Sequence, residues 1–140
     1  MLLGEYKHSL DPKNRIFIPA KYREELGESF IVAQSMREAC LRIYSKEEWE
    51  AYIAPIKRLD GKDRDRIIRT LTRNASQVSA DSQGRIVLTP ALIEFAKLQK
   101  NAVIVGCGGY AEIWSETNHA AMVEEEDMVD MKALLESYGL

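Results

Sequence analysis

The chain has 140 residues, 46% of them hydrophobic, and a net charge of −3, which fits one domain or two small halves that share a core. No apolar run approaches the roughly 18 residues that span a bilayer, and the first ten residues are too polar for a secretory signal. The only cysteines and histidines, Cys40, Cys107, His8 and His119, follow no metal-ligand or CxxC spacing, which favours a reducing cytoplasm and predicts no metal site.

The first third of the chain predicts a β-rich unit built around one tight turn. In "DPKN", Asp11 can accept hydrogen bonds from N–H groups two residues on, and Pro12 fixes its own φ at the value that the second turn position needs. The strands on either side are expected to pair as a β-hairpin, and Gly27 is expected to end a short helix. The expected order is a strand at 4–10, a strand at 15–18, a helix at 19–26 and strands at 30–33 and 41–44.

Two helices are expected in the middle of the chain. "SKEEWEAY" begins with a capping-box pattern, Ser45 followed by Glu48. "GKDRDRIIRTLTR" at about 61–73 places its apolar residues Ile67, Ile68 and Leu71 on one side. This second segment therefore reads as a linker helix.

The second half repeats the order of the first. "DSQG" forms the turn, and Thr89 is expected to cap a helix that has Pro90 at its first position. The expected strands lie at 76–80, 85–88, 103–106 and 112–114, with a turn at 107–109. A last helix at 118–138 is expected to bury one face, made of Met122, Val123, Val129, Met131, Leu134 and Leu135.

The two halves align at an offset of 70 residues. Arg15 falls on Arg85, and "IYS" at 43–45 falls on "IWS" at 113–115, although Pro19 and Pro90 are one position out of step. A match at both ends of a unit of about 40 residues indicates one supersecondary unit used twice. Because short hairpins are unstable alone, we expect the two units to close a shared β-barrel core of α+β class with short flanking helices.

This repeat predicts a single compact domain in four segments. They are a first unit at 1–52, a linker helix at 53–74, a second unit at 75–117 and a C-terminal helix at 118–140.

The two turns are the candidate functional site. Arg suits guanine edges, Gln and Asn suit adenine, Lys suits phosphate, and a β-hairpin can enter a major groove. Asp11, Asp81 and Gly84 are expected to shape the turns, because Gly84 and Asn14 share a slot that needs positive φ. The expected DNA contacts are Arg15, Arg85, Lys13, Asn14, Gln83 and Lys7, with Ser82, His8, Lys21 and Arg23 nearby.

Two alternatives stay open for these charges. The Asp–Arg pairs, Asp11–Arg15 and Asp81–Arg85, can be ion pairs that only pin the turns. In the linker helix, pairing with neighbouring aspartates is a commoner role than DNA contact for Arg64, Arg66, Arg69 and Arg73. Residues 1–73 carry 15 Lys and Arg against 12 Asp and Glu, and residues 74–140 carry 4 against 10. A basic half is typical of nucleic-acid binders, but it also fits plain surface solvation.

The segments "GEYKHSLDPKNRIFIP", "DSQGRIVLTP", "LRIYSKEEWE" and "EIWS" resemble the MraZ family of bacterial transcriptional regulators over nearly the whole chain. The resemblance implies two AbrB-like swapped-hairpin units and a cytoplasmic, nucleoid-associated ring of subunits. It also implies binding to direct repeats of double-stranded DNA in the promoter of the division and cell-wall gene cluster. The family's DNA-contacting arginines carry over to Arg15 and Arg85, and its turn residues to Lys13 and Gln83. The chain departs from the family pattern at Pro12, at Asn14 and in "LTP".

Other functions have less support in the sequence. No nucleophile triad is suggested, and "GCGG" lacks the lysine and the helix of a phosphate loop, so we expect no enzyme, cofactor, membrane or small-molecule substrate. An AbrB-type antitoxin or protein-interaction module remains the alternative. Antitoxins of that type usually have one unit and a disordered tail, whereas this chain has two units and a helical tail.

Overall fold

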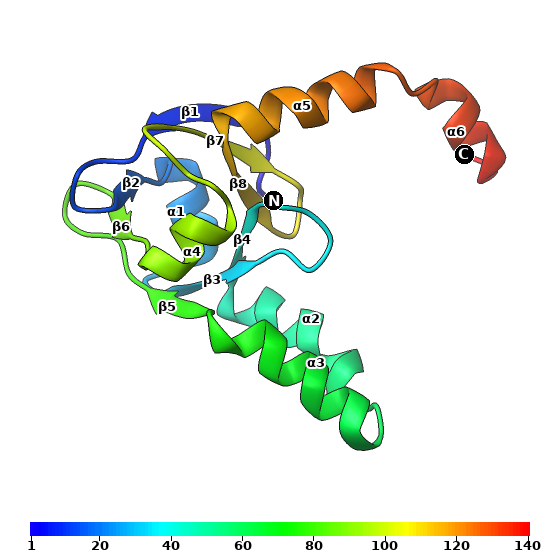
Figure 1. Ribbon diagram of the computed structural model, residues 1–140, viewed down its shortest axis with the longest axis horizontal. Helices are drawn as coiled ribbons and strands as arrows, with labels where there is room; N and C mark the ends of the chain where they lie inside the picture. The colour runs from blue at the N-terminus through cyan, green and yellow to red at the C-terminus, as the bar shows by residue number, and fades with distance from the viewer.

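A computed structural model describes residues 1–140. It contains eight strands and six helices that follow the repeated order expected from the sequence (Figure 1). The first half holds β1 (Glu5–Ser9), β2 (Arg15–Phe17), α1 (Ala20–Leu26), β3 (Phe30–Gln34), β4 (Leu41–Ser45), α2 (Lys46–Lys57) and α3 (Gly61–Arg73). The second half holds β5 (Ser76–Val78), β6 (Arg85–Val87), α4 (Pro90–Phe95), β7 (Asn101–Gly106), β8 (Ala111–Ser115), α5 (Glu116–Asp127) and α6 (Met131–Ser137).

The strands exchange partners between the two halves. Six form an antiparallel sheet in the order β1-β7-β8-β4-β3-β5, and β2 pairs with β6 as a separate ribbon. The expected opening hairpin of each unit is therefore wrong, because β1 pairs with β7 rather than β2, and β5 pairs with β3 rather than β6. The hairpin expected at the turn 107–109 is present as β7 and β8. The exchange confirms the swapped α+β arrangement. Its strand pairing forms a sheet and a ribbon rather than one closed hydrogen-bonded barrel.

The pairing obeys a pseudo-twofold relation. Ile16 pairs with Ile86, and Arg42 pairs with Glu112, so both central pairs join residues 70 positions apart. In each pair a residue meets its own counterpart from the other half. A rotation that exchanges the two halves maps each pair onto itself, so the pseudo-twofold axis passes through both pairs. Ile16 and Ile86 are fully buried. Each is the one core side chain of its three-residue strand, and pairing β2 with β6 lets each strand cover the isoleucine of the other, which favours the exchange of partners between the halves.

One hydrophobic core of 19 buried residues joins the two units. A second cluster of five, centred on Tyr44, Trp49, Ile53 and Leu71, packs the α2–α3 pair onto β3 and β4. The helix caps follow the sequence, since Ser45, Thr89 and Ser115 each accept an N–H from three residues on. Pro19 and Thr89 occupy the same N-cap position, so the one-residue displacement of the prolines leaves the repeat intact.

The C-terminal segment differs from the single buried helix that we expected. It divides into α5 and α6, because the side chain of Asp130 caps a new helix by accepting the N–H of Ala133. Met122 and Val123 are half-buried, but every residue from 131 to 140 is exposed. In Figure 1 this red end of the chain extends away from the strands. The expected buried face is therefore wrong for Val129, Met131, Leu134 and Leu135.

Candidate nucleic-acid interface

The two turns have the same hydrogen-bond pattern. In the first, Oδ1 of Asp11 accepts the N–H groups of Lys13 and Arg15 at 2.9 and 2.8 Å, and Oδ2 binds Nε of Arg15 at 2.6 Å. In the second, Oδ1 of Asp81 accepts the N–H groups of Gln83 and Arg85 at 2.9 Å each, and Oδ2 binds Nε of Arg85 at 3.0 Å. The departures at Pro12 and Asn14 thus leave the first turn with the hydrogen bonds of the second.

The β2–β6 ribbon holds the two turns side by side. The N–H of Ile18 donates to the carbonyl of Gly84, and the N–H of Leu88 donates to the carbonyl of Asn14. Both loops lie together at the left edge of Figure 1, away from the α2–α3 and α5–α6 pairs. Residues 70 positions apart in the chain therefore form one surface.

The shared slot of Asn14 and Gly84 does adopt positive φ, 61° and 79°. At Gly84 space is a second constraint, because a Cβ there would lie 2.8 Å from Cζ of Arg23 and 2.9 Å from the Phe17 ring. Arg23 itself donates from Nε to the carbonyl of Ile18 and lies over the Phe17 ring. The structure thus gives Arg23 a packing role beneath the second turn.

Both turn carboxylates are held ionised. Partial burial raises the pKa of Asp11, but the hydrogen bonds from Arg15 and Lys13 outweigh it and the net pKa is lowered. The backbone hydrogen bond from Arg85 lowers the pKa of Asp81, aided by Gln83 and the Arg85 guanidinium and opposed by desolvation. Each turn therefore carries a fixed negative charge behind its arginine.

The arginines still have donors to offer. Their side chains are 29% and 28% exposed, for Arg15 and Arg85, and each binds its own aspartate through Nε. An Nε contact leaves the terminal nitrogens of the Arg15 guanidinium free to bind a phosphate or a base edge. Lys13 and Gln83 are exposed at the two tips, and Asn14 is half-buried with its carbonyl used by Leu88.

Other candidate residues lie outside this paired-turn surface. Lys7 is exposed on β1, in a hollow that it shares with Asn101 and Glu116. The α3 arginines project on a separate helix pair (Figure 1), where Arg64 and Arg66 lie 3.3 and 3.6 Å from Asp65 and Asp63. The ion pairs that the sequence offered as the alternative role of α3 are thus present for two of its four arginines.

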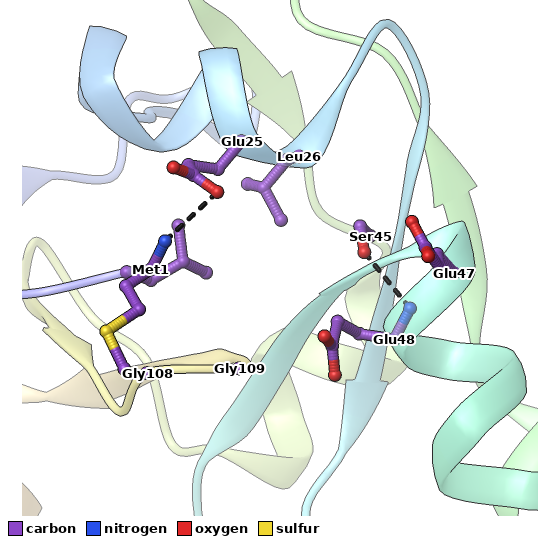
Figure 2. Close-up of a pocket in the computed structure, with 9 residues that line it drawn as sticks. Met1, Glu25, Leu26, Ser45, Glu47, Glu48, Gly108 and Gly109 are labelled. Carbon is purple, nitrogen blue, oxygen red and sulfur yellow. Dashed lines mark hydrogen bonds and ion pairs between the residues drawn. The ribbon is translucent and has the colours of Figure 1, made fainter.

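A second hollow, of about 330 Å³, lies between α1 and the start of α2 (Figure 2). The N-terminal amine of Met1 binds Glu25 there at 3.0 Å, and Glu47 and Glu48 add further carboxylates. These carboxylates would repel a phosphate backbone. The hollow therefore does not extend the candidate nucleic-acid surface.

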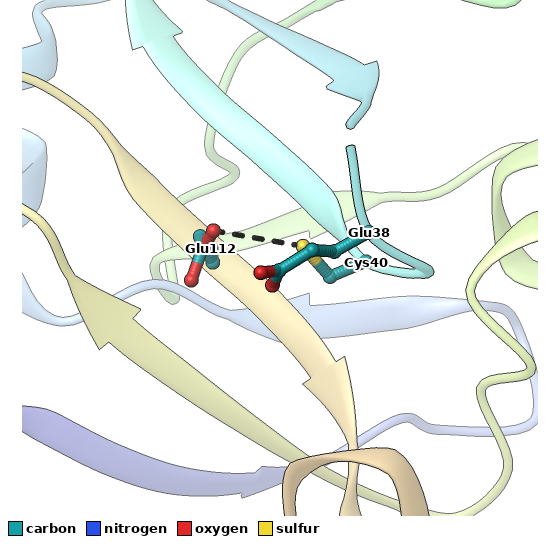
Figure 3. A group of neighbouring side chains, drawn as sticks. All are labelled: Glu38, Cys40 and Glu112. Atoms are coloured by element: carbon teal, nitrogen blue, oxygen red, sulfur yellow. Dashed lines mark hydrogen bonds between the residues drawn. The ribbon is translucent and has the colours of Figure 1, made fainter. Parts of the chain in front are cut away.

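The pairing of β4 with β8 brings together three side chains that sequence spacing did not group. The ligand atoms of Glu38, Cys40 and Glu112 lie within 4.8 Å of one another, and the Cys40 thiol donates to the Glu112 carboxylate at 3.7 Å (Figure 3). Burial, with the nearby carboxylates, raises the pKa of Cys40, which keeps it a thiol. Metals bind the thiolate, so this chemistry favours a hydrogen-bonded structural cluster. The grouping depends on the long-range pairing of β4 with β8, which no local sequence motif reveals.

Comparisons with known proteins agree with the repeat. A family model described as "MraZ protein, putative antitoxin-like" matches residues 1–68 and 71–134. A protein of Carboxydothermus hydrogenoformans is 43% identical over 118 residues, covering 83% of this chain and 82% of its own. A protein of Clostridium acetobutylicum is 38% identical over 138 residues, covering 97% and 95%. One of Alkaliphilus oremlandii is 45% identical over 117 residues, covering 82% and 81%. All three are named transcriptional regulator MraZ.

Proposed function

Because this chain belongs to the MraZ family of transcriptional regulators, we propose that it is a sequence-specific DNA-binding protein whose paired turns contact the double helix. Its target in this proposal is a set of direct repeats in the promoter of the division and cell-wall gene cluster. The protein acts there in the cytoplasm, on the nucleoid. No helix of the chain combines the length and the apolar character needed to cross a membrane.

The observation that carries the proposal is the placement of Arg15 and Arg85 on the same ribbon, diagonal to each other across the Ile16–Ile86 pair, each aligned by its own aspartate. Aligned guanidinium groups lose little side-chain entropy on binding, and Arg is the residue best matched to phosphate oxygens and guanine edges. Lys13 and Gln83 at the tips add a cation and an amide group to the same surface.

One chain offers few phosphate contacts and would bind weakly at physiological salt. We therefore include a ring of identical subunits in the proposal. Several paired-turn surfaces that meet equally spaced repeats gain avidity without any new kind of contact. The regular spacing of direct repeats suits a closed, rotationally symmetric assembly.

The experiment is a gel-shift titration of the full chain on labelled DNA from upstream of its own gene, at two salt concentrations. A scrambled fragment of the same length and composition is the control. We expect tighter binding to the natural fragment, with affinity that falls as salt rises. Equal binding to both fragments would contradict sequence-specific recognition.

The alternative is an antitoxin-type module whose main partner is a protein. The exposed apolar residues of α6 favour it, since large exposed apolar surfaces mark interaction sites. Purification of the chain from its native cells separates the two functions. An obligate antitoxin would bring a second polypeptide in fixed ratio, whereas a regulator that assembles with itself would not.

A further inference from the structure

The C-terminal tail, α5 and α6, presents an apolar stripe that nothing in its own chain covers. Met131, Leu134, Leu135 and Tyr138 follow the i, i+3, i+4, i+7 spacing of one helix face and are 50%, 43%, 45% and 76% exposed. An isolated helix shorter than about 12 to 15 residues is marginal in water. The seven residues of α6 therefore need a packing partner to remain helical.

The pseudo-twofold relation shows why α6 does not find that partner within its own half. The helix α5 matches α2 at both ends at the 70-residue offset, and α6 begins where the counterpart of α3 would begin. In the first half, Trp49 and Ile53 of α2 hold α3 in place. His119 replaces Trp49 in the second half, and its side chain turns to Glu5 of β1 at 3.0 Å. The tail therefore contacts the rest of the chain at the start of α5, whereas α6 is exposed.

A surface on the other helix pair is complementary to the tail. A groove of about 450 Å³, which we call the hairpin groove, lies beside α2 and α3. It is lined by Lys57, Arg64, Asp65, Ile68 and Arg69. It offers a largely basic wall around one apolar side chain. Exposed Leu59 lies in the loop that joins α2 to α3.

The charges of the two surfaces are opposite. Residues 57–73 carry seven Lys and Arg against three Asp, whereas residues 116–140 carry seven Asp and Glu against one Lys. Arg69 has no ion-pair partner within its own chain, and neither has Asp127 or Glu136. Opposite fields of this kind steer and orient association.

We infer that the tail of one copy docks in the hairpin groove of a second copy of the same chain. The apolar stripe of α6 covers Ile68 and Leu59 of the neighbour, while the tail carboxylates face Arg64 and Arg69. The inference rests on the proposed ring, because it names the two surfaces that join one subunit to the next. In Figure 1 the α2–α3 pair extends to the lower right and the α5–α6 tail to the upper right, so the two surfaces are separate within one chain.

Two different surfaces on each subunit give a heterologous contact. Such a contact leaves one tail and one groove unused in any open chain of subunits, and a closed ring uses all of them. The docking also assigns the basic face of α3 to a protein neighbour. DNA recognition then belongs to the paired turns alone.

The test uses the full-length protein in light scattering after size-exclusion chromatography over a range of concentrations. One variant reverses the groove, Arg64→Glu with Arg69→Glu, and another reverses the tail, Asp127→Arg with Glu136→Arg. A third variant carries all four substitutions. The control, Glu24→Arg with Glu28→Arg, changes two exposed acidic residues elsewhere. Circular dichroism checks that each variant is folded.

We expect each reversal alone to raise the midpoint concentration of dissociation at least about tenfold, because each repels its partner surface. The four-substitution variant should recover most of the loss, and the control should match the natural chain. If the natural chain assembles and the reversals leave its mass unchanged, the docking is wrong while the ring stands. A natural chain that is monomeric at every concentration overturns both. Reversals that alter the melting temperature but not the mass would show that the tail folds onto its own chain, which also overturns the docking.

Discussion

Nη1 of Arg85 lies 4.0 Å from Oδ2 of Asp11, the oxygen that Nε of Arg15 contacts at 2.6 Å. One carboxylate of the first turn therefore faces both arginines, whereas Asp81 pairs only with Arg85. The two turns are alike in backbone but unequal in charge environment, and Arg85 is oriented by two acidic groups.

Replacing either arginine by alanine should weaken DNA binding while the protein stays folded. If the side chain contacts a base edge we expect a loss of about 1–3 kcal/mol, and if it contacts phosphate we expect a salt slope smaller by about 1. Fluorescence anisotropy at several salt concentrations measures both quantities for Arg15→Ala and Arg85→Ala. Lys46→Ala, an exposed cation at the start of α2 and away from the turns, is the control. An unfolded variant whose remaining folded fraction binds normally would assign that arginine a purely structural role.

Acid should weaken the fold through the turn aspartates. Their folded-state pKa values lie below the ordinary value of 3.8, so the unfolded chain binds more protons in acid. The stabilisation is complete above the unfolded pKa and is lost as pH falls through the folded pKa. Melting temperatures measured from pH 6 to pH 2 should fall across this range. The fall should be smaller in Asp11→Asn with Asp81→Asn, and a curve unchanged by these substitutions would place the acid sensitivity elsewhere.

Gly84→Ala should be strongly destabilising, whereas Asn14→Gly should be nearly neutral. Alanine at position 84 combines a left-handed backbone, about 1–2 kcal/mol, with a Cβ placed 2.8 Å from Arg23. We expect a total loss of at least about 2 kcal/mol. Asparagine and glycine both tolerate the left-handed region, so the change at position 14 should stay within about 0.5 kcal/mol. Urea denaturation measures both values, and equal effects would contradict the geometry of the two slots.

The same substitution should act differently in α3 and α6. Leu71 is 1% exposed in the second core cluster and Leu134 is 43% exposed on the tail. Leu71→Ala should lower the free energy of unfolding by about 2–5 kcal/mol. Leu134→Ala should change it by less than about 0.5 kcal/mol at concentrations where the chain is monomeric. A large loss from Leu134→Ala under those conditions would show that the tail packs within its own chain.

Local chemistry was enough to predict the elements of the fold and the form of the turns. Aspartate at the first position and Asn14 or Gly84 at the fourth specify the turn through hydrogen bonds that span only four residues. The placement of Arg15 beside Arg85 followed from the repeat, and their contact with DNA stays a prediction.

Partner choice between strands could not be predicted in the same way. The turn at Asp11 has the same hydrogen bonds whether β2 pairs with β1 or with β6, so the local pattern does not distinguish the two arrangements. Periodicity likewise showed that α6 has an apolar face but not what covers that face. Asp130 is a common type of N-cap residue and could have indicated that a new helix begins there. The apolar pattern runs through it and favoured one continuous helix instead.

The crossed ribbon also bears on how such a chain arises. A polypeptide with only one unit would have an unpaired β2 edge and an uncovered isoleucine, and an identical polypeptide would satisfy both about a true twofold axis. The repeated sequence and the exchanged strands are together what fusion of two copies of a homodimeric unit would produce. The two halves differ at Trp49 and His119 but keep an isoleucine at positions 16 and 86, and neither half can complete its core without the other.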